Sequence, residues 1–312
     1  MRIIFFGTSV FAAQILSFLL KNSFNITAVV TQPDRPRGRH LHSTFSPVKE
    51  IAVSAGLTVV QPEKISTPEN VELIKSYHPD LFIVVAYGEI IKKSLLEIPR
   101  IGPYNIHASL LPKYRGAAPI QRCLMGGEKK TGINIIEMTP QMDAGDIVAS
   151  AEIEIGHEMT FGELEAALCD LASSLTKKFL HQISEGTLIR NPQDPSLVTF
   201  APKLQADDER IDWNKPAEIL HNLIRALSPR PGAWCPIFLG KEEKRLKIKR
   251  ACVCAGSQEL PPGTVIAWGK QGCIVACKEG ALQLLEVQLE GKKALPVAEF
   301  IKGIHEPVSF IK

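Results

Sequence analysis

One stretch of the sequence restricts the fold more than any other. Residues Leu81–Ile91, LFIVVAYGEII, are apolar almost throughout. A strand that is buried on both faces has this composition, and such strands occur in parallel sheets covered by helices on either side. Further segments of the first half of the chain have strand-like patterns, namely Arg2–Phe6, Ile26–Gln32, Tyr104–Ala108 and Gly132–Met138. The sequence therefore predicts an α/β domain with a mostly parallel, Rossmann-like sheet.

Helical segments alternate with these strands. Ser46–Gly56 has a serine cap, a proline in its first turn and a glycine after its end. Thr160–Gly186 is the clearest helix, because Thr160 and Glu163 form a capping box ahead of regularly spaced leucines. We expect this helix to close an N-terminal domain of residues 1–189.

The rest of the chain has a different pattern. Residues 190–205 are polar and broken by prolines, which predicts a linker. After a short amphipathic helix at Lys215–Leu227, several short β-like runs are separated by turns. For residues 206–312 this pattern favours a small OB-like β-barrel, a fold that often binds oligonucleotides.

The net charge of +3 is unevenly distributed along the chain. Residues 203–312 carry 17 Lys and Arg against 13 Asp and Glu, most densely in Lys241–Arg250, KEEKRLKIKR. Such a run is most often a solvated strand face, and it also suits a surface that binds a polyanion. The run alone leaves both interpretations open.

Cysteine and histidine usage argues against disulfides and metal. The seven cysteines are an odd number without a C-x-x-C pair, so we expect them to be reduced. The eight histidines show no zinc-ligand spacing, and we expect no metal site. The N-terminal apolar run ends at Phe6, too early for a signal peptide or a membrane span, which predicts a cytoplasmic protein that does not bind membranes.

Polar residues cluster where predicted strands end. In NIHASLLPKYRGAAP, residues 105–119, Asn105 and His107 alternate along a strand and so share one face. Open parallel sheets bind ligands outside the carboxyl ends of their strands. An amide beside an imidazole can stabilise charge on a carbonyl oxygen and move a proton. A histidine packed against backbone groups in a tight corner explains this pair as well.

A carboxylate loop follows the next predicted strand. QMDAGD, residues 141–146, brings Asp143 and Asp146 into a glycine-containing loop that we expect at the same edge of the sheet. Asp near Gly is also typical of an Asx turn. Asn, His and Asp that converge from adjacent strand ends are more specific than any one of them, and together they indicate a catalytic site.

Three loops are relevant to ligand binding. Ser109–Pro119 is stiffened by prolines, and its leucines offer an apolar wall that suits a flat heterocycle. Pro33–Lys49 is rich in arginine and can bind an RNA end or a phosphate. Both loops are also explained as ordinary surface connectors. The first strand–helix turn, GTSVFA, has one glycine, which argues against a nicotinamide or flavin enzyme.

These motifs together resemble those of the folate-dependent formyltransferases. The resemblance is carried by N-I-H-A-S-L-L-P-x-x-R-G-A-A-P and the downstream M-D-A-G-D. TQPDRPRGR, VVAYGEII, TGINIIEM, ERIDW and RPGAW extend it over nearly the whole chain. Within the family, the Arg-rich loop and the added C-terminal domain are most similar to the members that act on initiator methionyl-tRNA.

The resemblance implies that the formyl group of 10-formyltetrahydrofolate passes to the α-amino group of methionyl initiator tRNA, without a metal and in a monomer. Catalytic positions of the family match Asn105, His107 and Asp143, and the match selects Asp143 over Asp146. The folate-binding residues that it implies are Val85, Ala86, Tyr87, Gly88, Ser109, Leu110, Leu111 and Pro112. The expected tRNA-binding residues are Arg35, Arg37, Arg39, Lys244, Arg245, Lys247 and Lys249.

One departure from the family pattern and three alternatives remain. Arg39 is followed by His40, Leu41 and His42 instead of lysines, so we expect this loop to bind RNA more weakly or with more dependence on pH. The alternatives are a formyltransferase that acts on a small amine, such as an amino sugar nucleotide or glycinamide ribonucleotide, a folate hydrolase, and a non-catalytic RNA-binding module. The first leaves the basic C-terminal domain unexplained, and the Asn, His and Asp cluster argues against the last.

Overall fold

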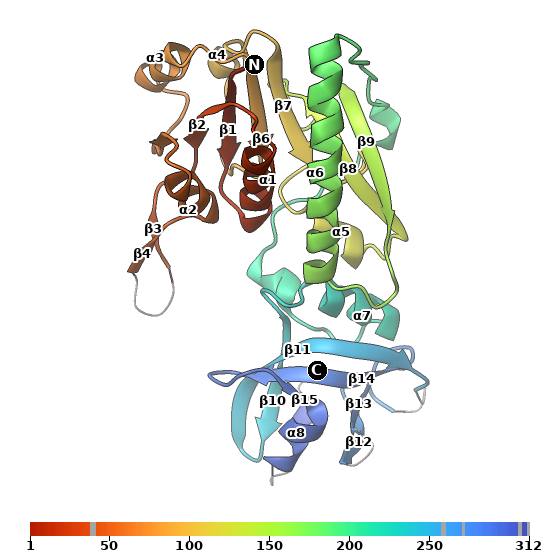
Figure 1. Ribbon diagram of the computed structural model, residues 1–312. Helices are drawn as coiled ribbons and strands as arrows, with labels where there is room; N and C mark the ends of the chain where they lie inside the picture. Colours follow the sequence, from red (N-terminus) through yellow and green to blue (C-terminus); the bar gives the residue numbers. More distant parts are fainter. Residues whose placement is uncertain (38–41, 257–259, 270–271, 305–307, 311–312) are drawn as a thin grey trace. The chain divides into compact units, whose positions relative to one another are not determined.

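The computed structural model describes residues 1–37, 42–256, 260–269, 272–304 and 308–310 (Figure 1). The chain forms two compact units. Unit 1 comprises Met1–Pro119, Lys130–Ile153 and Glu165–Pro202, and unit 2 comprises Ile120–Lys129, Glu154–Leu164 and Lys203–Lys312. Most of the predicted linker thus groups with unit 1, and the predicted domain limits of 1–189 and 206–312 stay a prediction.

Unit 1 is built on a seven-stranded sheet with the order β5-β2-β1-β6-β7-β8-β9. Its strands are β1 (Ile3–Gly7), β2 (Ile26–Val30), β5 (Val59–Val60), β6 (Leu81–Val85), β7 (Gly102–His107), β8 (Lys130–Glu137) and β9 (Ile147–Glu154). The strands from β5 to β7 run parallel, whereas β8 runs antiparallel to β7. The mostly parallel, Rossmann-like sheet is therefore confirmed. A separate hairpin pairs β3 (Arg35–Arg37) with β4 (His42–Thr44).

Helices cover both faces of this sheet. They are α1 (Val10–Lys21), α2 (Pro47–Ser54), α3 (Pro68–Ser76), α4 (Lys93–Leu96) and α6 (Phe161–Glu185). One face of the strands packs with residues of α3 and α4 into a single apolar cluster. On the opposite face, Tyr104 of β7 meets Phe179 of α6 with ring centroids 4.8 Å apart, and Figure 1 shows α1 and α6 in front of the strands. Every residue of β6 is buried, as its apolar sequence requires.

The helix ends follow the caps visible in the sequence. Ser46 accepts a hydrogen bond from the backbone N–H of Lys49 and starts α2, with Pro47 in the first turn. At α6 the Thr160 N–H donates to Glu163 Oε2 at 2.8 Å, and the Glu163 N–H donates to Thr160 Oγ1 at 3.4 Å. The predicted capping box is therefore confirmed. Within the described ranges, no helix is both long and apolar enough to cross a membrane.

Strand β6 is shorter than the sequence predicts. It ends at Val85 and does not reach Ile91, because Ala86 (φ 43°) and Gly88 (φ 92°) adopt left-handed backbone that a strand does not continue through. The backbone leaves the sheet after Val85, and Ala86 and Gly88 are exposed, whereas Tyr87 and Ile91 still pack into the apolar core.

Unit 2 contains an antiparallel sheet with the order β12-β13-β14-β11-β10-β16, and β15 pairs with β14. Its strands are β10 (Ala233–Leu239), β11 (Glu242–Cys254), β12 (Val265–Gly269), β13 (Gly272–Ala276), β14 (Ala281–Leu289), β15 (Leu295–Pro296) and β16 (Val308–Phe310). The outermost strands β12 and β16 contact each other, so the sheet is nearly closed. The predicted smaller, OB-like barrel is confirmed.

Unit 2 also contains helices, and two short 3-10 helices lie in the chain before its first strand. The helices are α5 (Pro119–Met125), α7 (Ala217–Ala226) and α8 (Val297–Lys302), and the 3-10 helices are η1 (Pro195–Leu197) and η2 (Ala206–Glu209). The fully buried Trp213 and residues of α7 and α8 share one apolar core with the strands. All seven cysteines are free, and burial raises the pKa of Cys273 to about 12.

The contact between β8 and β9 leaves no room for a side chain at Gly132. A Cβ there would overlap the carbonyl oxygen of Ala151 and lie 2.6 Å from Leu110 Cδ2. We expect Gly132→Ala to lower the free energy of unfolding by about 1–3 kcal/mol, because backbone atoms must shift. Urea unfolding followed by circular dichroism measures this.

Gly156→Ala is the matched control, because the nearest atom to its Cβ would be Met159 Cβ at 3.8 Å and its φ is not left-handed. That variant should unfold close to the wild-type midpoint. A wild-type midpoint for Gly132→Ala as well would contradict this account of the β8–β9 contact.

Candidate active site

The parallel strands β1, β2, β6 and β7 end at one edge of the unit 1 sheet, where open α/β sheets bind ligands. Side chains connect the loops at this edge. Thr8 Oγ1 donates to the carbonyl oxygen of Tyr87 at 2.8 Å and accepts from the N–H of Gln32 at 3.3 Å. The ends of β1, β2 and β6 are thereby fixed relative to one another.

Asn105, His107 and Asp143 lie together at this edge. Asn105 Nδ2 donates to Asp143 Oδ1 at 3.2 Å, and His107 Nδ1 lies 3.7 Å from Asp143 Oδ2. The backbone N–H of Gly116 donates to the same Oδ2 at 2.9 Å. His107 is only 5% exposed. One carboxylate thus joins an amide, an imidazole and a backbone donor.

Asp143 reaches the site by a different path from the one predicted. Because β8 is antiparallel to β7, its end at Glu137 pairs with Tyr104, beside the start of β7 and away from the carboxyl edge. The loop after β8 then turns back toward His107. Asp143 adopts a left-handed φ of 50° in this loop, while Asp146 uses its carbonyl oxygen to accept from the Glu137 N–H. The expectation that Asp143 converges on the site from an adjacent strand end was therefore wrong.

The hydrogen-bond partner of Nε2 determines the tautomer of His107. Nε2 lies 3.0 Å from the carbonyl oxygen of Tyr114. A carbonyl oxygen only accepts, so Nε2 carries a hydrogen and donates it. Nδ1, which faces Asp143, is therefore the nitrogen that can take up or release a proton.

The predicted folate segment Ser109–Pro112 follows β7 directly and is held by side chains. Ser109 Oγ donates to the carbonyl oxygen of Lys113 at 2.7 Å. The N–H of Leu111 donates to Asn134 Oδ1 at 2.6 Å. Leu111 is buried and Leu110 is partly exposed. Asn134 of β8, which the sequence did not single out, thus fixes the position of this loop.

The predicted folate segment Val85–Gly88 presents backbone rather than the Tyr87 side chain. Tyr87 is 2% exposed and packs edge-on against Phe6, with ring centroids 5.6 Å apart, and burial raises the pKa of its phenol. The Tyr87 ring therefore belongs to the core, and a role of this residue in folate binding stays a prediction. Beside Gly88, Gln32 Nε2 is buried and has no hydrogen-bond partner among the residues that the structure describes. An unpaired buried donor at this edge fits a ligand with acceptor atoms.

The Arg-rich loop is described only in part. Arg35 is exposed and forms a 3.6 Å ion pair with Glu63. Arg37 ends β3, and Arg39, His40 and Leu41 lie outside the described residues. The expected effect of the His40–Leu41–His42 sequence stays a prediction.

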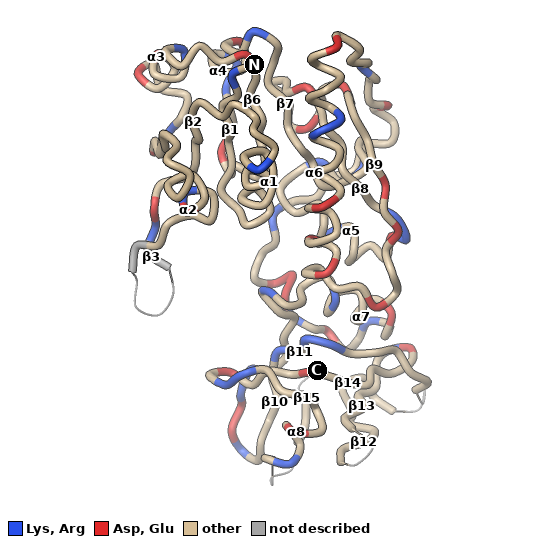
Figure 2. The backbone as a smooth tube through the Cα atoms, viewed as in Figure 1, with Lys and Arg blue, Asp and Glu red and all other residues tan. Residues whose placement is uncertain are grey.

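The basic run on β11 divides into exposed and buried side chains, and Figure 2 shows Lys and Arg along this strand. Arg245 is exposed and stacks over Trp234 with its guanidinium carbon 4.0 Å from the ring centroid. Lys244 pairs with Glu242 at 2.8 Å. Lys247 Nζ donates to the carbonyl oxygen of Pro231 at 2.7 Å.

Lys249 does not fit the predicted role in tRNA binding. It is 9% exposed, and its Nζ donates to the carbonyl oxygen of Pro229 at 2.6 Å. Burial lowers the pKa of this amine, with a further contribution from Lys247. The residue holds the SPRPG turn and is not available to a phosphate.

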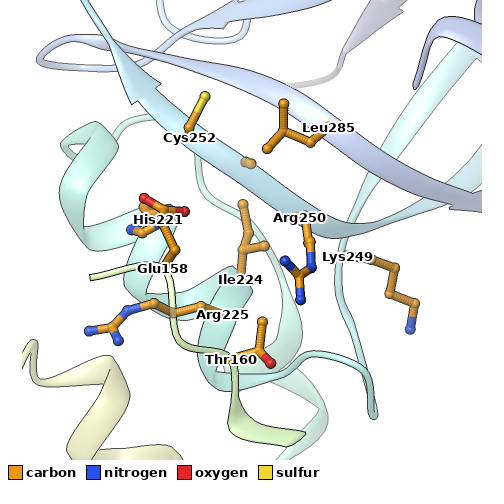
Figure 3. A pocket seen from close by; sticks show the side chains of 10 residues that line it. Glu158, Thr160, His221, Ile224, Arg225, Lys249, Arg250, Cys252 and Leu285 are labelled. Atoms are coloured by element: carbon orange, nitrogen blue, oxygen red, sulfur yellow. Dashed lines mark hydrogen bonds and ion pairs between the residues drawn. The ribbon is translucent and has the colours of Figure 1, made fainter. Parts of the chain in front are cut away.

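Unit 2 also contains a pocket of about 320 Å³, walled by Ile224 and Leu285 and bordered by His221 and Glu158 (Figure 3). His221 Nε2 lies 3.2 Å from Glu158 Oε2, and His157 Nδ1 lies 2.8 Å from Glu158 Oε1. Burial opposes the charge on Glu158, but the hydrogen bonds to both histidines hold its pKa below the ordinary value.

These histidines raise the question of a metal site that sequence spacing does not reveal. His157, Glu218 and His221 place ligand atoms within 4.8 Å of one another. The two imidazole rings are stacked, however, with centroids 5.0 Å apart and an interplanar angle of 16°. Ring nitrogens of parallel stacked rings do not converge on one point, as tetrahedral ligation requires. We interpret the cluster as an ion-paired contact between residues 154–164 and α7.

Comparison with known proteins agrees with this geometry. Residues 1–180 match the model of the formyl transferase family, and residues 203–305 match the model of the formyl transferase C-terminal domain. The chain belongs to the formyl transferase family. It is 47% identical to the methionyl-tRNA formyltransferase of Protochlamydia amoebophila (strain UWE25) over 304 residues, covering 97% of this chain and 95% of that protein. The corresponding protein of Chlamydia pneumoniae is 44% identical over 305 residues, with the same coverage.

Solved structures share the fold of this chain. HypX from Aquifex aeolicus in complex with tetrahydrofolic acid has a TM-score of 0.66 at 20% sequence identity, over 98% of this chain and 48% of HypX. This chain therefore spans about half the length of HypX. The sugar 3N-formyl transferase WlaRD, in the presence of dTDP and 5-N-formyl-THF, has a TM-score of 0.65 at 18% identity, over 94% of this chain and 99% of WlaRD. The resemblance inferred from the motifs is thus confirmed at the level of family and fold.

Proposed function

We propose that this chain transfers the formyl group of 10-formyltetrahydrofolate to the α-amino group of methionyl initiator tRNA. The observation that carries the proposal is the meeting of Asn105, His107 and Asp143 in a chain that is 47% identical to a methionyl-tRNA formyltransferase. That similarity covers both family domains, including the basic C-terminal one. The tetrahydrofolic acid bound to HypX supports folate as the formyl carrier.

The site has the donors that formyl transfer needs. Attack of the amine on the formyl carbon places negative charge on the formyl oxygen. Asn105 Nδ2 has two hydrogens and gives one to Asp143, so the other can donate to this oxygen. Protonated Nδ1 of His107 supplies a second donor, because Nε2 is already used by Tyr114. Loss of one such donor costs on the order of 10²–10³ in rate.

Asp143 supports the proton transfer. Its carboxylate faces His107 Nδ1 at 3.7 Å, within ion-pairing distance but too far for a direct hydrogen bond. In our proposal Asp143 orients protonated His107 by its charge and, through a water beside the carboxylate, passes the proton from the attacking amine to the departing folate nitrogen. A positioned acid or base of this kind contributes about 10²–10⁴ in rate.

The folate would lie along the carboxyl edge of the sheet. Ala86 and Gly88 offer exposed backbone, and Ser109, Leu110, Leu111 and Pro112 form the adjacent loop. Val85 and Tyr87 support this edge from the core, and Tyr87 contributes its backbone only. The unpaired Gln32 Nε2 joins the set as a donor.

The tRNA contacts in this proposal are mostly electrostatic. Arg35, Arg37 and Arg39 of the N-terminal loop, with Lys244, Arg245 and Lys247 of β11, supply the positive charge. We assign catalysis to residues 1–189 and tRNA binding to residues 206–312. We also propose that the protein acts as a cytoplasmic monomer, for which light scattering should give a mass near 34.3 kDa.

The proposed reaction is tested with labelled 10-formyltetrahydrofolate. The protein is offered charged initiator methionyl-tRNA, charged elongator methionyl-tRNA and free small amines, and the label is followed. Label on initiator methionyl-tRNA supports the proposal. Label only on a small amine, or only in formate, would replace it with one of the two folate-dependent alternatives.

We expect Asn105→Ala and His107→Ala each to lower kcat at least about 100-fold, because each removes a donor to the developing oxyanion. Single-turnover formyl transfer measures the loss. His181→Ala is the control, because His181 is an exposed residue of α6 paired with Glu185. Turnover near the wild-type value in Asn105→Ala or His107→Ala would contradict the assigned roles.

A second prediction separates the two kinds of basic residue on β11. Arg245→Gln should weaken tRNA binding and reduce the salt dependence of log K by about 0.7–0.9, the value for one lost phosphate contact. Lys249→Met should leave that slope unchanged, because its Nζ is bound to Pro229. Titration of tRNA at several salt concentrations measures both slopes, and equal slopes for wild type and Arg245→Gln would remove Arg245 from the contact surface.

A further inference from the structure

The side-chain amide of Gln193 contacts residues 141–146, here called the Asp143 loop, and all of its hydrogen-bonding positions are occupied. Its Nε2 donates to the carbonyl oxygens of Asp143 and Gly145, each at 2.8 Å. Its Oε1 accepts from Arg115 Nε at 3.1 Å and from Arg115 Nη2 at 2.8 Å. An amide offers two N–H donors and two acceptor lone pairs, so every hydrogen-bonding position of this side chain is occupied.

These partners permit only one orientation of the amide. A flipped amide would turn its N–H groups toward the guanidinium of Arg115 and its oxygen toward two carbonyl oxygens. Arg115 is 7% exposed, so its charge acts on Gln193 with little screening by water. Charge-assisted hydrogen bonds are stronger than neutral ones, and Arg115 thereby holds Gln193 in place.

The Asp143 loop needs such support. Asp143 has a φ of 50°, a left-handed conformation that Asp adopts more readily than most residues but that still costs free energy, which neighbouring contacts offset. A Cβ on Gly145 would overlap the carbonyl oxygen of Glu137, so this part of the loop is packed closely against the end of β8. The carboxylate of Asp143 must also meet Asn105 and Gly116 at the same time.

The segment that carries Gln193 also holds the loop that carries Gly116. The N–H of Arg115 donates to the carbonyl oxygen of Thr199 at 2.9 Å, and the N–H of Ala201 donates to the carbonyl oxygen of Arg115 at 2.7 Å. Residues 193–201 therefore contact two loops. One loop carries Asp143, and the other carries Gly116, whose N–H donates to the Asp143 carboxylate.

We propose that Gln193, held by Arg115, is a positioning residue for formyl transfer. It fixes the backbone from Asp143 to Gly145 so that the carboxylate faces Asn105 and His107. The inference rests on the proposed function, because its effect is on the rate of that reaction. Gln193 does not touch the reacting atoms in this account and acts only through Asp143.

The test compares Gln193→Met and Gln193→Glu with wild type in single-turnover formyl transfer. Methionine removes all four hydrogen bonds, whereas glutamate still accepts from Arg115 but cannot donate to the carbonyl oxygens of Asp143 and Gly145. We expect each to lower kcat about 10- to 100-fold, as small misplacements of catalytic groups do, with little change in KM. Gln14→Glu, the same substitution at an exposed position of α1, is the control and should keep the wild-type kcat.

A double-mutant cycle separates positioning from a general structural role. In an Asp143→Asn background, Gln193→Met should cause little further loss, because the residue through which it acts is already impaired. A loss of the same factor in both backgrounds would overturn the proposal, and so would a kcat within about twofold of wild type for Gln193→Met. If Gln193→Met does not fold, Gln193→Glu gives the same cycle. An inactive wild-type protein would count against the proposed function instead.

Discussion

The structure of the candidate site depends on the carboxylate of Asp143. One oxygen accepts from Asn105, and the other accepts from Gly116 and faces His107. A carboxylate with donors at both oxygens has few orientations, so the imidazole and the amide acquire a fixed relation to it. Asp143 adopts a left-handed backbone, and Gln193 and Gly116 contact this residue from two sides.

Much of unit 1 could be predicted because local sequence signals, such as helix caps, agree with the burial that the apolar segments require. The apolar sequence of β6 required cover on both faces, and the caps of α2 and α6 lie where Ser46 and Thr160 occur. The direction of β8 could not be predicted, since an apolar strand pattern is the same whether the strand runs parallel or antiparallel. The proximity of Asp143 to His107 was expected, but the expected path was wrong, because a returning loop and not a parallel strand end brings it there.

Two further features could not be predicted from the sequence, for physical reasons. Gln193 lies in a proline-broken polar stretch that is typical of a linker, and its role becomes visible only through contacts with Arg115 and the Asp143 loop. Lys249 belongs to a basic run whose composition predicts exposure. The SPRPG turn covers its end of β11, so its ammonium group binds Pro229 instead of solvent. Counting charges along a strand does not show which of them another segment covers.

The most direct test of the account asks whether Asn105 and Asp143 work as one unit. Single-turnover formyl transfer is measured for Asn105→Ala, Asp143→Ala and the double variant, with folding checked by circular dichroism. If the Asp143 carboxylate and the Asn105 amide act as one catalytic unit, the rate of the double variant should be little lower than that of the slower single variant. If the two losses multiply, the residues act independently, and the shared carboxylate seen in the structure is not the basis of catalysis.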